Sequence, residues 1–121
     1  MAAGSGSRFG EKKQFKLLKG KALYSYSLNK FLLCENVSEI ILVVPKSSLV
    51  EIKKEISNIK KTKKVYVVSG GHRRQDSVKN GLLSVSTKSQ LVCIHDGARP
   101  FVSEKLIKQS IIACSKNDGA I

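Results

Sequence analysis

Three short runs of β-branched and aliphatic residues constrain the fold of this chain more than any other feature. The first spans 39–45, and similar runs follow at 65–68 and 91–94. Runs that are apolar throughout, without polar alternation, are typical of strands covered on both faces of a parallel sheet. We therefore predict strands over these three stretches.

Amphipathic helical patterns lie between and around the predicted strands. Leu49, Ile52, Ile56 and Ile59 recur at spacings of three and four, with lysines and glutamates on the other side, which predicts a crossover helix. Further helices are predicted over 22–33, over 76–83, and after Pro100, where Ser103 is placed to cap the helix and Asp118-Gly119 to end it.

Alternating strands and helices imply parallel pairing through right-handed crossovers. The predicted fold class is α/β, an open and mostly parallel sheet with helices on both faces. Loops at the carboxyl ends of the strands are then expected to carry the ligand site.

Length and composition favour one folded domain over residues 1–121. The chain is too short to divide into two domains, and hydrophobic residues make up 41% of it. Met1 stands at a glycine-rich loop with no strand before it, and Ile121 stands where another strand begins to form. We expect a fold that is incomplete at both ends.

Compartment and redox state follow from what the sequence contains. It shows neither a run of the roughly 20 apolar residues needed to span a membrane nor a hydrophobic signal core, which predicts a soluble protein. The three cysteines lie far apart in sequence, without zinc-ligand spacing. We expect buried, reduced thiols at Cys34, Cys93 and Cys114.

A formal net charge of +13 makes nucleic acid an alternative partner. Lysine dominates this charge, however, and is spread along most of the chain with few aromatic residues between for base stacking. Solvated lysine-rich faces are the preferred interpretation.

The first segment that can carry chemistry is glycine- and serine-rich and ends in cations. It runs from Ala2 to Gly10 and is followed by Lys12 and Lys13. Glycines let backbone N–H groups approach an anion, while Arg8 and a following lysine can neutralise phosphate charge. Its spacing matches neither a Walker loop nor a dinucleotide fingerprint. A flexible glycine-serine terminus is the alternative.

The second and third segments each follow a predicted strand. In the segment 69–77, paired glycines permit close approach to a base or ribose, and Asp76 or Ser77 can cap the next helix or bind the ligand. In the segment 95–100, Asp96 can share a magnesium ion with triphosphate oxygens and Arg99 can bind a phosphate or orient a ribose. The alternatives are a bare capped turn and a structural Asp–Arg pair.

Taken in order, these segments resemble the 2-C-methyl-D-erythritol 4-phosphate cytidylyltransferase family. The resemblance rests on these stretches: Ala-Ala-Gly-Ser-Gly-Ser-Arg, Lys-Gln-Phe, Gly-Gly-His-Arg-Arg-Gln-Asp-Ser-Val and His-Asp-Gly-Ala-Arg-Pro-Phe. It covers the whole chain but only about the first half of what the family normally contains. One departure is Lys12, which stands where the family usually has proline.

The resemblance implies a Rossmann-like nucleotidyltransferase fold and transfer of CMP from CTP to the sugar-alcohol phosphate, with Mg²⁺ accompanying the nucleotide, in non-mevalonate isoprenoid precursor biosynthesis. Arg8 and Lys13 resemble the catalytic cations that stabilise the transition state. The resemblance further implies a phosphate loop made of Ala2, Ala3, Gly4, Gly6 and Ser7. It places Gly71, His72 and Ser77 around the cytosine and ribose. It places Asp96, Gly97 and Arg99 on the opposite side, with Asp96 as the metal ligand.

The resemblance also implies a homodimer, formed through an arm in the half of the family that this chain does not contain, and a cytoplasmic or plastid location. The alternatives are a ribitol 5-phosphate cytidylyltransferase, a basic nucleic-acid-binding module, and a remnant without activity of its own. The two histidines show no partner arrangement for nucleophilic catalysis, and we expect both to be loop or packing residues.

Overall fold

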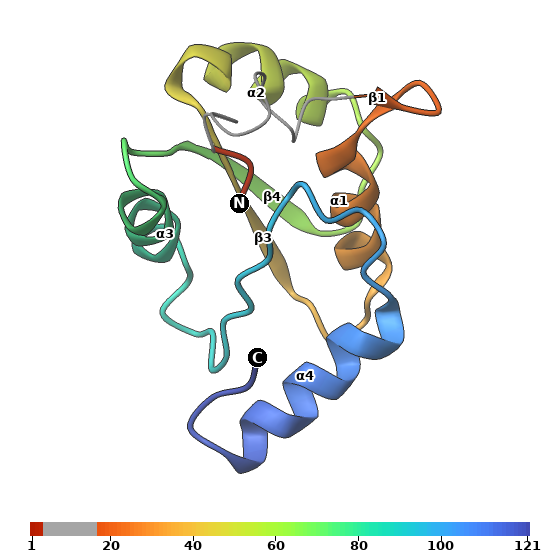
Figure 1. Cartoon of the computed structure of the whole chain (residues 1–121), viewed down its shortest axis with the longest axis vertical. Coiled ribbons are helices and arrows are strands. Elements are labelled where there is room, and N and C mark those ends of the chain that lie inside the picture. Colours follow the sequence, from red (N-terminus) through yellow and green to blue (C-terminus); the bar gives the residue numbers. More distant parts are fainter. Residues whose placement is uncertain (4–16) are drawn as a thin grey trace.

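The computed structural model describes residues 1–3 and 17–121 (Figure 1). No helix in these ranges is long and apolar enough to span a bilayer. The elements are, in chain order, β1 (Leu17–Leu18), β2 (Lys21–Ala22), α1 (Leu23–Leu33), β3 (Glu39–Val44), the 3-10 turn η2 (Lys46–Ser48), α2 (Leu49–Ser57), β4 (Lys64–Ser69), α3 (Arg74–Leu83) and α4 (Glu104–Lys116).

The centre of the fold is a parallel pair of strands, β3 and β4, joined by α2. Their register runs from Glu39 beside Lys64 to Val44 beside Ser69. A parallel pair needs a crossover connection, and the amphipathic stretch predicted for it forms α2. The predictions of both strands and of their parallel pairing are confirmed. The two strands end side by side, so the loops that follow them start from one edge of the sheet.

Helices cover both faces of this sheet, as predicted for the fold class. One face carries the main core, in which α1 and α2 pack against β3 and β4; its buried members are Ala2, Tyr24, Leu28, Leu42, Val44, Ile52, Ile56 and Val67. On the other face α3 lies against β3, since a Cβ added at Gly81 would sit 3.0 Å from Val43 Cγ2. Successive side chains of a strand point to opposite faces, which explains why Leu42 and Val44 belong to the main core while Val43 faces α3.

Side-chain hydrogen bonds tie the helices into place. Ser103 Oγ accepts from the Leu106 N–H at 3.0 Å, so the predicted cap of the last helix is confirmed. Tyr24 on α1 donates to Glu55 Oε2 on α2 at 2.9 Å. Burial raises the pKa of Tyr24 well above its usual range, and the hydrogen bond to the Glu55 carboxylate raises it further.

The predicted strand at 91–94 is wrong in this structure. These residues form no ladder, and Leu91, Val92 and Ile94 are 42%, 48% and 51% exposed. The physical reason is the absence of a neighbour: among the described residues only Met1–Ala3 lie between this stretch and β3. A strand exists through its inter-strand hydrogen bonds. For the same reason Cys93 is exposed, against the expectation of a buried thiol, whereas Cys34 is buried and Cys114 half-buried.

A short hairpin before α1 was not predicted from the sequence. Strands β1 and β2 pair antiparallel around Lys19 and Gly20, whose φ angles are +52° and +81°. Two successive positive φ values make a tight turn that glycine favours. The Lys-Gly pair was its sequence signal.

Candidate functional site

The predicted site residues fall into two groups. Gly4, Gly6, Ser7, Arg8 and Lys13 lie outside the described residues, so their roles stay predictions. Of the others, five are joined by contacts near the ends of β3 and β4, as the following paragraphs describe: Ala2, Ala3, Gly71, Ser77 and Gly97.

Ala2 joins the amino-terminal segment to the sheet. Its N–H donates to the Val43 carbonyl at 2.6 Å, and the residue is only 2% exposed. The Gly97 N–H donates to the Met1 carbonyl at 2.6 Å, and a Cβ added at Gly97 would lie 2.7 Å from that oxygen. The residue directly before the first predicted segment is therefore in backbone contact with the third.

Gly70 brings the second segment to the same place. A Cβ added there would lie 2.4 Å from Ala3 Cβ and 2.6 Å from Ser77 Oγ, distances at which side chains overlap. Ser77 is buried and accepts a hydrogen bond from the Gly71 N–H at 3.1 Å. Ser77 thus shapes the loop through its hydroxyl, and Gly70 lets Ala3 and the first turn of α3 pack against the end of β4.

The turn after Gly71 presents charged side chains to solvent. Arg73 pairs with Asp76 in a two-pronged contact, Nε to Oδ2 and Nη2 to Oδ1, both at 3.0 Å. The Arg73 side chain lowers the pKa of the Asp76 carboxyl, and the Asp76 carboxylate also accepts from the Arg73 N–H, which begins α3. His72 is exposed in the same turn. The capped-turn interpretation of Asp76 is thus observed.

Asp96 and Arg99 form a loose pair in the third segment. Asp96 Oδ1 accepts from the Ala98 N–H at 3.0 Å, while its Oδ2 lies 3.8 Å from Arg99 Nε. The side chains are 47% and 80% exposed. The pair fixes the turn, as the structural alternative holds, yet both charged heads remain accessible to a ligand.

His95 is a half-buried packing residue, as expected. Its ring lies 5.3 Å from that of Phe31, and Nε2 is 3.1 Å from the Arg99 carbonyl and 3.3 Å from Ser27 Oγ. Burial lowers the pKa of His95, a shift that the hydrogen bond with the Arg99 carbonyl partly opposes. Its role is to hold the loop that carries Arg99.

The described residues contain no group of three His, Cys, Asp or Glu side chains able to hold a metal ion alone. Asp96 offers a carboxylate whose side chain is 47% exposed. Mg²⁺ commonly takes one or two protein carboxylates and completes its shell with phosphate oxygens and water. The site therefore fits a metal that arrives with a triphosphate.

Comparison with known proteins decides the family. A sequence model described as 2-C-methyl-D-erythritol 4-phosphate cytidylyltransferase matches residues 1–121. The chain belongs to this family.

Relatives of the same name extend the match. Those of Clostridium acetobutylicum and Dictyoglomus thermophilum are 44% and 43% identical, over 99% and 97% of this chain and 53% and 51% of their own length. A crystal structure of 4-diphosphocytidyl-2C-methyl-D-erythritol synthase from Anaerococcus prevotii superposes with a TM-score of 0.81 at 33% identity, covering 96% of this chain and 48% of that one. The chain spans about half the length of these cytidylyltransferase relatives.

The structure adds two positioning residues that the sequence-based analysis missed. Asn80 Nδ2 donates to the Ser69 carbonyl at 3.0 Å and so ties α3 to the end of β4. Ser27 Oγ donates to the Arg99 carbonyl at 2.8 Å. Asn80 had a signal, because it lies three residues after Ser77 and thus on the same helix face. Ser27 had none, since its partner is 72 residues away.

Proposed function

We propose that this chain forms the nucleotide-binding half of a cytidylyltransferase that transfers CMP from CTP to 2-C-methyl-D-erythritol 4-phosphate and releases pyrophosphate. One observation carries the proposal: the family match extends over residues 1–121, and its described motif segments meet at the carboxyl edge of β3 and β4. In open α/β sheets, ligands bind at this edge.

In the proposed reaction a phosphate oxygen of the sugar phosphate attacks the α-phosphorus of CTP, the new P–O bond forms, and the bond to pyrophosphate breaks. Negative charge is spread over the oxygens around phosphorus in the transition state. Arg8 and Lys13 are the proposed catalytic cations, which stabilise that charge. Gly4, Gly6 and Ser7 are proposed to complete the phosphate loop that Ala2 and Ala3 begin.

The nucleoside is proposed to lie between the two described loops. Gly71, His72 and Ser77 are proposed to form one side. Asp96, Gly97 and Arg99 form the other. Mg²⁺, when bound with CTP, would screen triphosphate charge, and Asp96 is the residue proposed to hold it, because its side chain is 47% exposed.

The sugar phosphate is proposed to be methylerythritol phosphate. The relatives reported above carry that name, which favours it over ribitol 5-phosphate. Homodimer formation and a cytoplasmic or plastid location stay predictions from the resemblance.

The test is a calorimetric titration of the chain with CTP and ATP, with and without Mg²⁺, at two salt concentrations. We expect saturable, CTP-selective binding that strengthens with Mg²⁺. Arg8→Ala and Lys13→Ala are each expected to weaken CTP binding by roughly tenfold, the value of one charged hydrogen bond. Lys53→Ala on the outer side of α2, which removes the same charge, serves as the control.

Three results would contradict the proposal. Equal binding of CTP and ATP with steep salt dependence would indicate a basic module that binds polyanions. Equal weakening by Lys53→Ala would make the effect one of net charge. No binding of either nucleotide would leave the inactive-remnant alternative. Asp96→Asn is expected to reduce the Mg²⁺ enhancement alone, and an unchanged enhancement would remove Asp96 as the metal ligand.

A further inference from the structure

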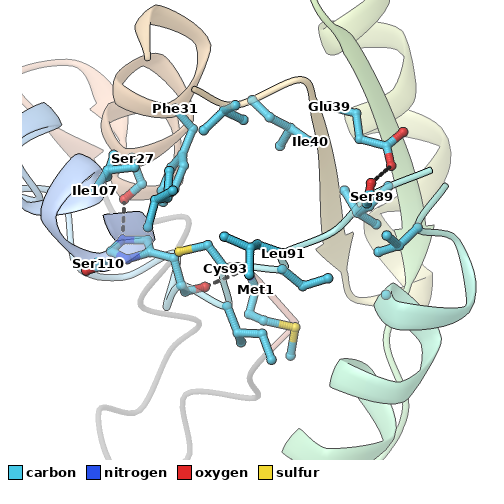
Figure 2. Close-up of a pocket in the computed structure, with 18 of the residues that line it drawn as sticks. Met1, Ser27, Phe31, Glu39, Ile40, Ser89, Leu91, Cys93, Ile107 and Ser110 are labelled. Atoms are coloured by element: carbon cyan, nitrogen blue, oxygen red, sulfur yellow. Dashed lines mark hydrogen bonds between the residues drawn. The ribbon is translucent and has the colours of Figure 1, made fainter. Parts of the chain in front are cut away.

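The two sides of the β3–β4 sheet differ in what lies beside them. On the β3 side the chain folds back, and Glu39 Oε1 accepts from the Ser86 N–H at 2.8 Å and lies 3.3 Å from Ser89 Oγ (Figure 2). On the other side, β4 pairs with no strand besides β3 among the described residues. The outer side of β4 is therefore a free edge of the described sheet.

The direction of the backbone groups along β4 follows from its pairing with β3. The Gly70 N–H, directly after β4, donates to the Val44 carbonyl at 2.8 Å and so points to β3. Along a strand the N–H and C=O groups of alternate residues point to the same side. Those of Val68 and Tyr66 therefore also point to β3.

Val65, Val67 and Ser69 consequently direct their N–H and C=O groups outward. The Ser69 carbonyl shows this direction, because Asn80 Nδ2 donates to it at 3.0 Å from outside the ladder. The outward groups of Val65 and Val67 have no hydrogen-bond partner among the described residues. These two residues thus present two donors and two acceptors in strand geometry.

A cavity of about 430 Å³ runs along this free edge, between α2 and the end of α3. We call it the edge groove. Its floor is the consecutive stretch 65–68 of β4, in which Tyr66 is 44% exposed. Its walls divide between the two faces of the sheet: Lys53, Ile56 and Lys61 on that of α2, and Tyr66, Val68 and Ser84 on that of α3.

The charge around the edge groove is positive. Residues 53–64 contain six lysines and a single glutamate, Glu55, whose carboxylate accepts from the Tyr24 hydroxyl. Among the described residues no acidic side chain lines the groove, and none pairs with Lys53 or Lys61. Lys61 Nζ binds the Ile56 carbonyl, but an ammonium group has three donors. The groove therefore favours a partner with carboxylates.

The pattern of backbone groups favours a peptide over other anions. A phosphate chain accepts from the N–H groups of Val65 and Val67 but has no donor for their carbonyls, whereas an extended peptide offers both. A second copy of this chain is disfavoured by charge. Two β4 edges side by side would bring the lysines of 60–64 toward those of the other copy or toward its Arg73 and Arg74.

We propose that the edge groove binds an acidic extended peptide as an added strand, antiparallel to β4, with carboxylates toward Lys53 and Lys61 and an apolar side chain toward Tyr66. Two peptide residues exchange both backbone hydrogen bonds with Val65 and Val67, as opposed residues of an antiparallel pair do. Their side chains share the α2 face with these valines, and the residue between them lies on the face of Tyr66. The proposal does not depend on the function proposed above.

The test is a titration of the full chain with a capped peptide of three glutamates alternating with two valines. We expect a saturable rise in melting temperature of about 3 °C at peptide concentrations far above the dissociation constant. The affinity measured by calorimetry is expected to fall several-fold as salt is raised. In hydrogen exchange the amides of Val65 and Val67 are expected to gain protection, whereas those of Tyr66 and Val68 already bond to β3 and change little.

Three matched peptides separate the contributions to binding. Lysine in place of glutamate keeps the strand and reverses its charge. Three glutamates followed by two valines keep the composition but lose the alternation of the two faces. Methyl groups on the nitrogens of the two pairing glutamates keep the side chains but remove the backbone donors. Each of these peptides is expected to leave the Val65 and Val67 amides unprotected.

Val65→Pro tests the edge from the side of the protein. The Val65 N–H takes no part in the ladder with β3, and proline is tolerated on edge strands whose N–H faces solvent. We therefore expect a folded variant that binds the glutamate peptide about tenfold more weakly. Should Val65→Pro fail to fold, the methylated peptide removes the equivalent hydrogen bonds from the other partner.

Several results would overturn the proposal. One is the absence of any effect of the glutamate peptide, and another is an equal effect of the lysine peptide. A rise in melting temperature without protection of the Val65 and Val67 amides would indicate diffuse binding of polyanions instead. A peptide-free dimer in which both amides are already protected would show that a second copy occupies the edge.

Discussion

At Gly70 a single hydrogen atom allows the amino-terminal segment and α3 to pack against the end of β4. The added methyl group of an alanine would overlap Ala3 Cβ and Ser77 Oγ at 2.4 and 2.6 Å, and neither neighbour is the end of a long flexible side chain. The sequence pattern pointed to Gly70 and Gly71 as places of close backbone approach. The structure identifies what approaches Gly70, namely another segment of this chain.

Gly70→Ala is expected to lower the free energy of unfolding by about 1–3 kcal/mol, the usual range for overpacking a tight site. Chemical denaturation measures it. Gly119→Ala is the control, because an added Cβ there meets nothing within 4 Å, and its effect is expected to stay within about 0.5 kcal/mol. Equal effects at the two positions would contradict the close contact.

His95 makes stability depend on pH. Burial lowers its pKa below the ordinary 6.5 in the folded state, so between that lower value and about 6.5 the unfolded chain binds more protons. The contribution is fully present above about pH 6.5 and is lost as the pH falls through the folded pKa. The melting temperature is expected to fall between about pH 7 and pH 5.

Two variants assign this slope. His95→Asn is expected to flatten it, whatever its effect at neutral pH, whereas His72→Asn at the exposed turn is expected to leave it unchanged. A slope that follows His72 instead would contradict the burial of His95.

At the scale of elements, capping decides where the helices end. Ser103 caps the amino end of α4. At the carboxyl ends of α1 and α2, lysine side chains bind backbone carbonyl groups. Lys63 Nζ donates to the Phe31 carbonyl at 3.0 Å and to that of Cys34, and Lys61 Nζ donates to the Ile56 carbonyl at 2.9 Å. Cations suit the negative end of a helix. Part of the lysine excess thus has a structural use that does not involve nucleic acid.

Ser103→Ala is expected to destabilise the fold by about 1 kcal/mol, since the Leu106 N–H loses its acceptor. Ser115→Ala, near the exposed end of the same helix, removes a hydroxyl that donates to the Ile112 carbonyl and is expected to be neutral within about 0.5 kcal/mol. Thermal melts followed by circular dichroism compare the two. A larger loss from the second variant would show that the cap is unimportant.

At the scale of the whole molecule, the net charge of +13 opposes compaction. Ion pairs offset little of it in the described residues, where the pairs are exposed. Leu91, Val92 and Ile94 add exposed apolar surface, and we expect marginal stability from both effects.

Raising NaCl from about 20 to about 300 mM is expected to increase the melting temperature by a few degrees, because the Debye length falls below the spacing of most surface charges. KCl must give the same increase at equal ionic strength, since screening does not depend on the cation. A melting temperature that stays constant or falls would show that charge repulsion does not limit the stability of the fold.

Sequence alone determined the parts of this protein whose physics is local or periodic. The continuous apolar runs at 39–45 and 65–68, the three-and-four spacing of α2 and the Ser103 cap each gave the correct element, because burial pattern and capping act over a few residues. The family motifs likewise identified the loops at the carboxyl edge of the sheet. Those signals sufficed for the fold class, whereas the roles of the candidate site residues stay predictions.

Only the tertiary structure decided what depends on partners far along the chain. The run 91–94 has the composition of a strand, yet a strand needs a neighbour, and the residues beside it supply only the short contact at Met1–Ala3. The contacts of Ser27 with Arg99 and of Ala3 with Gly70 join segments separated by dozens of residues. No local pattern encodes such pairs, because their energy arises only when the elements pack.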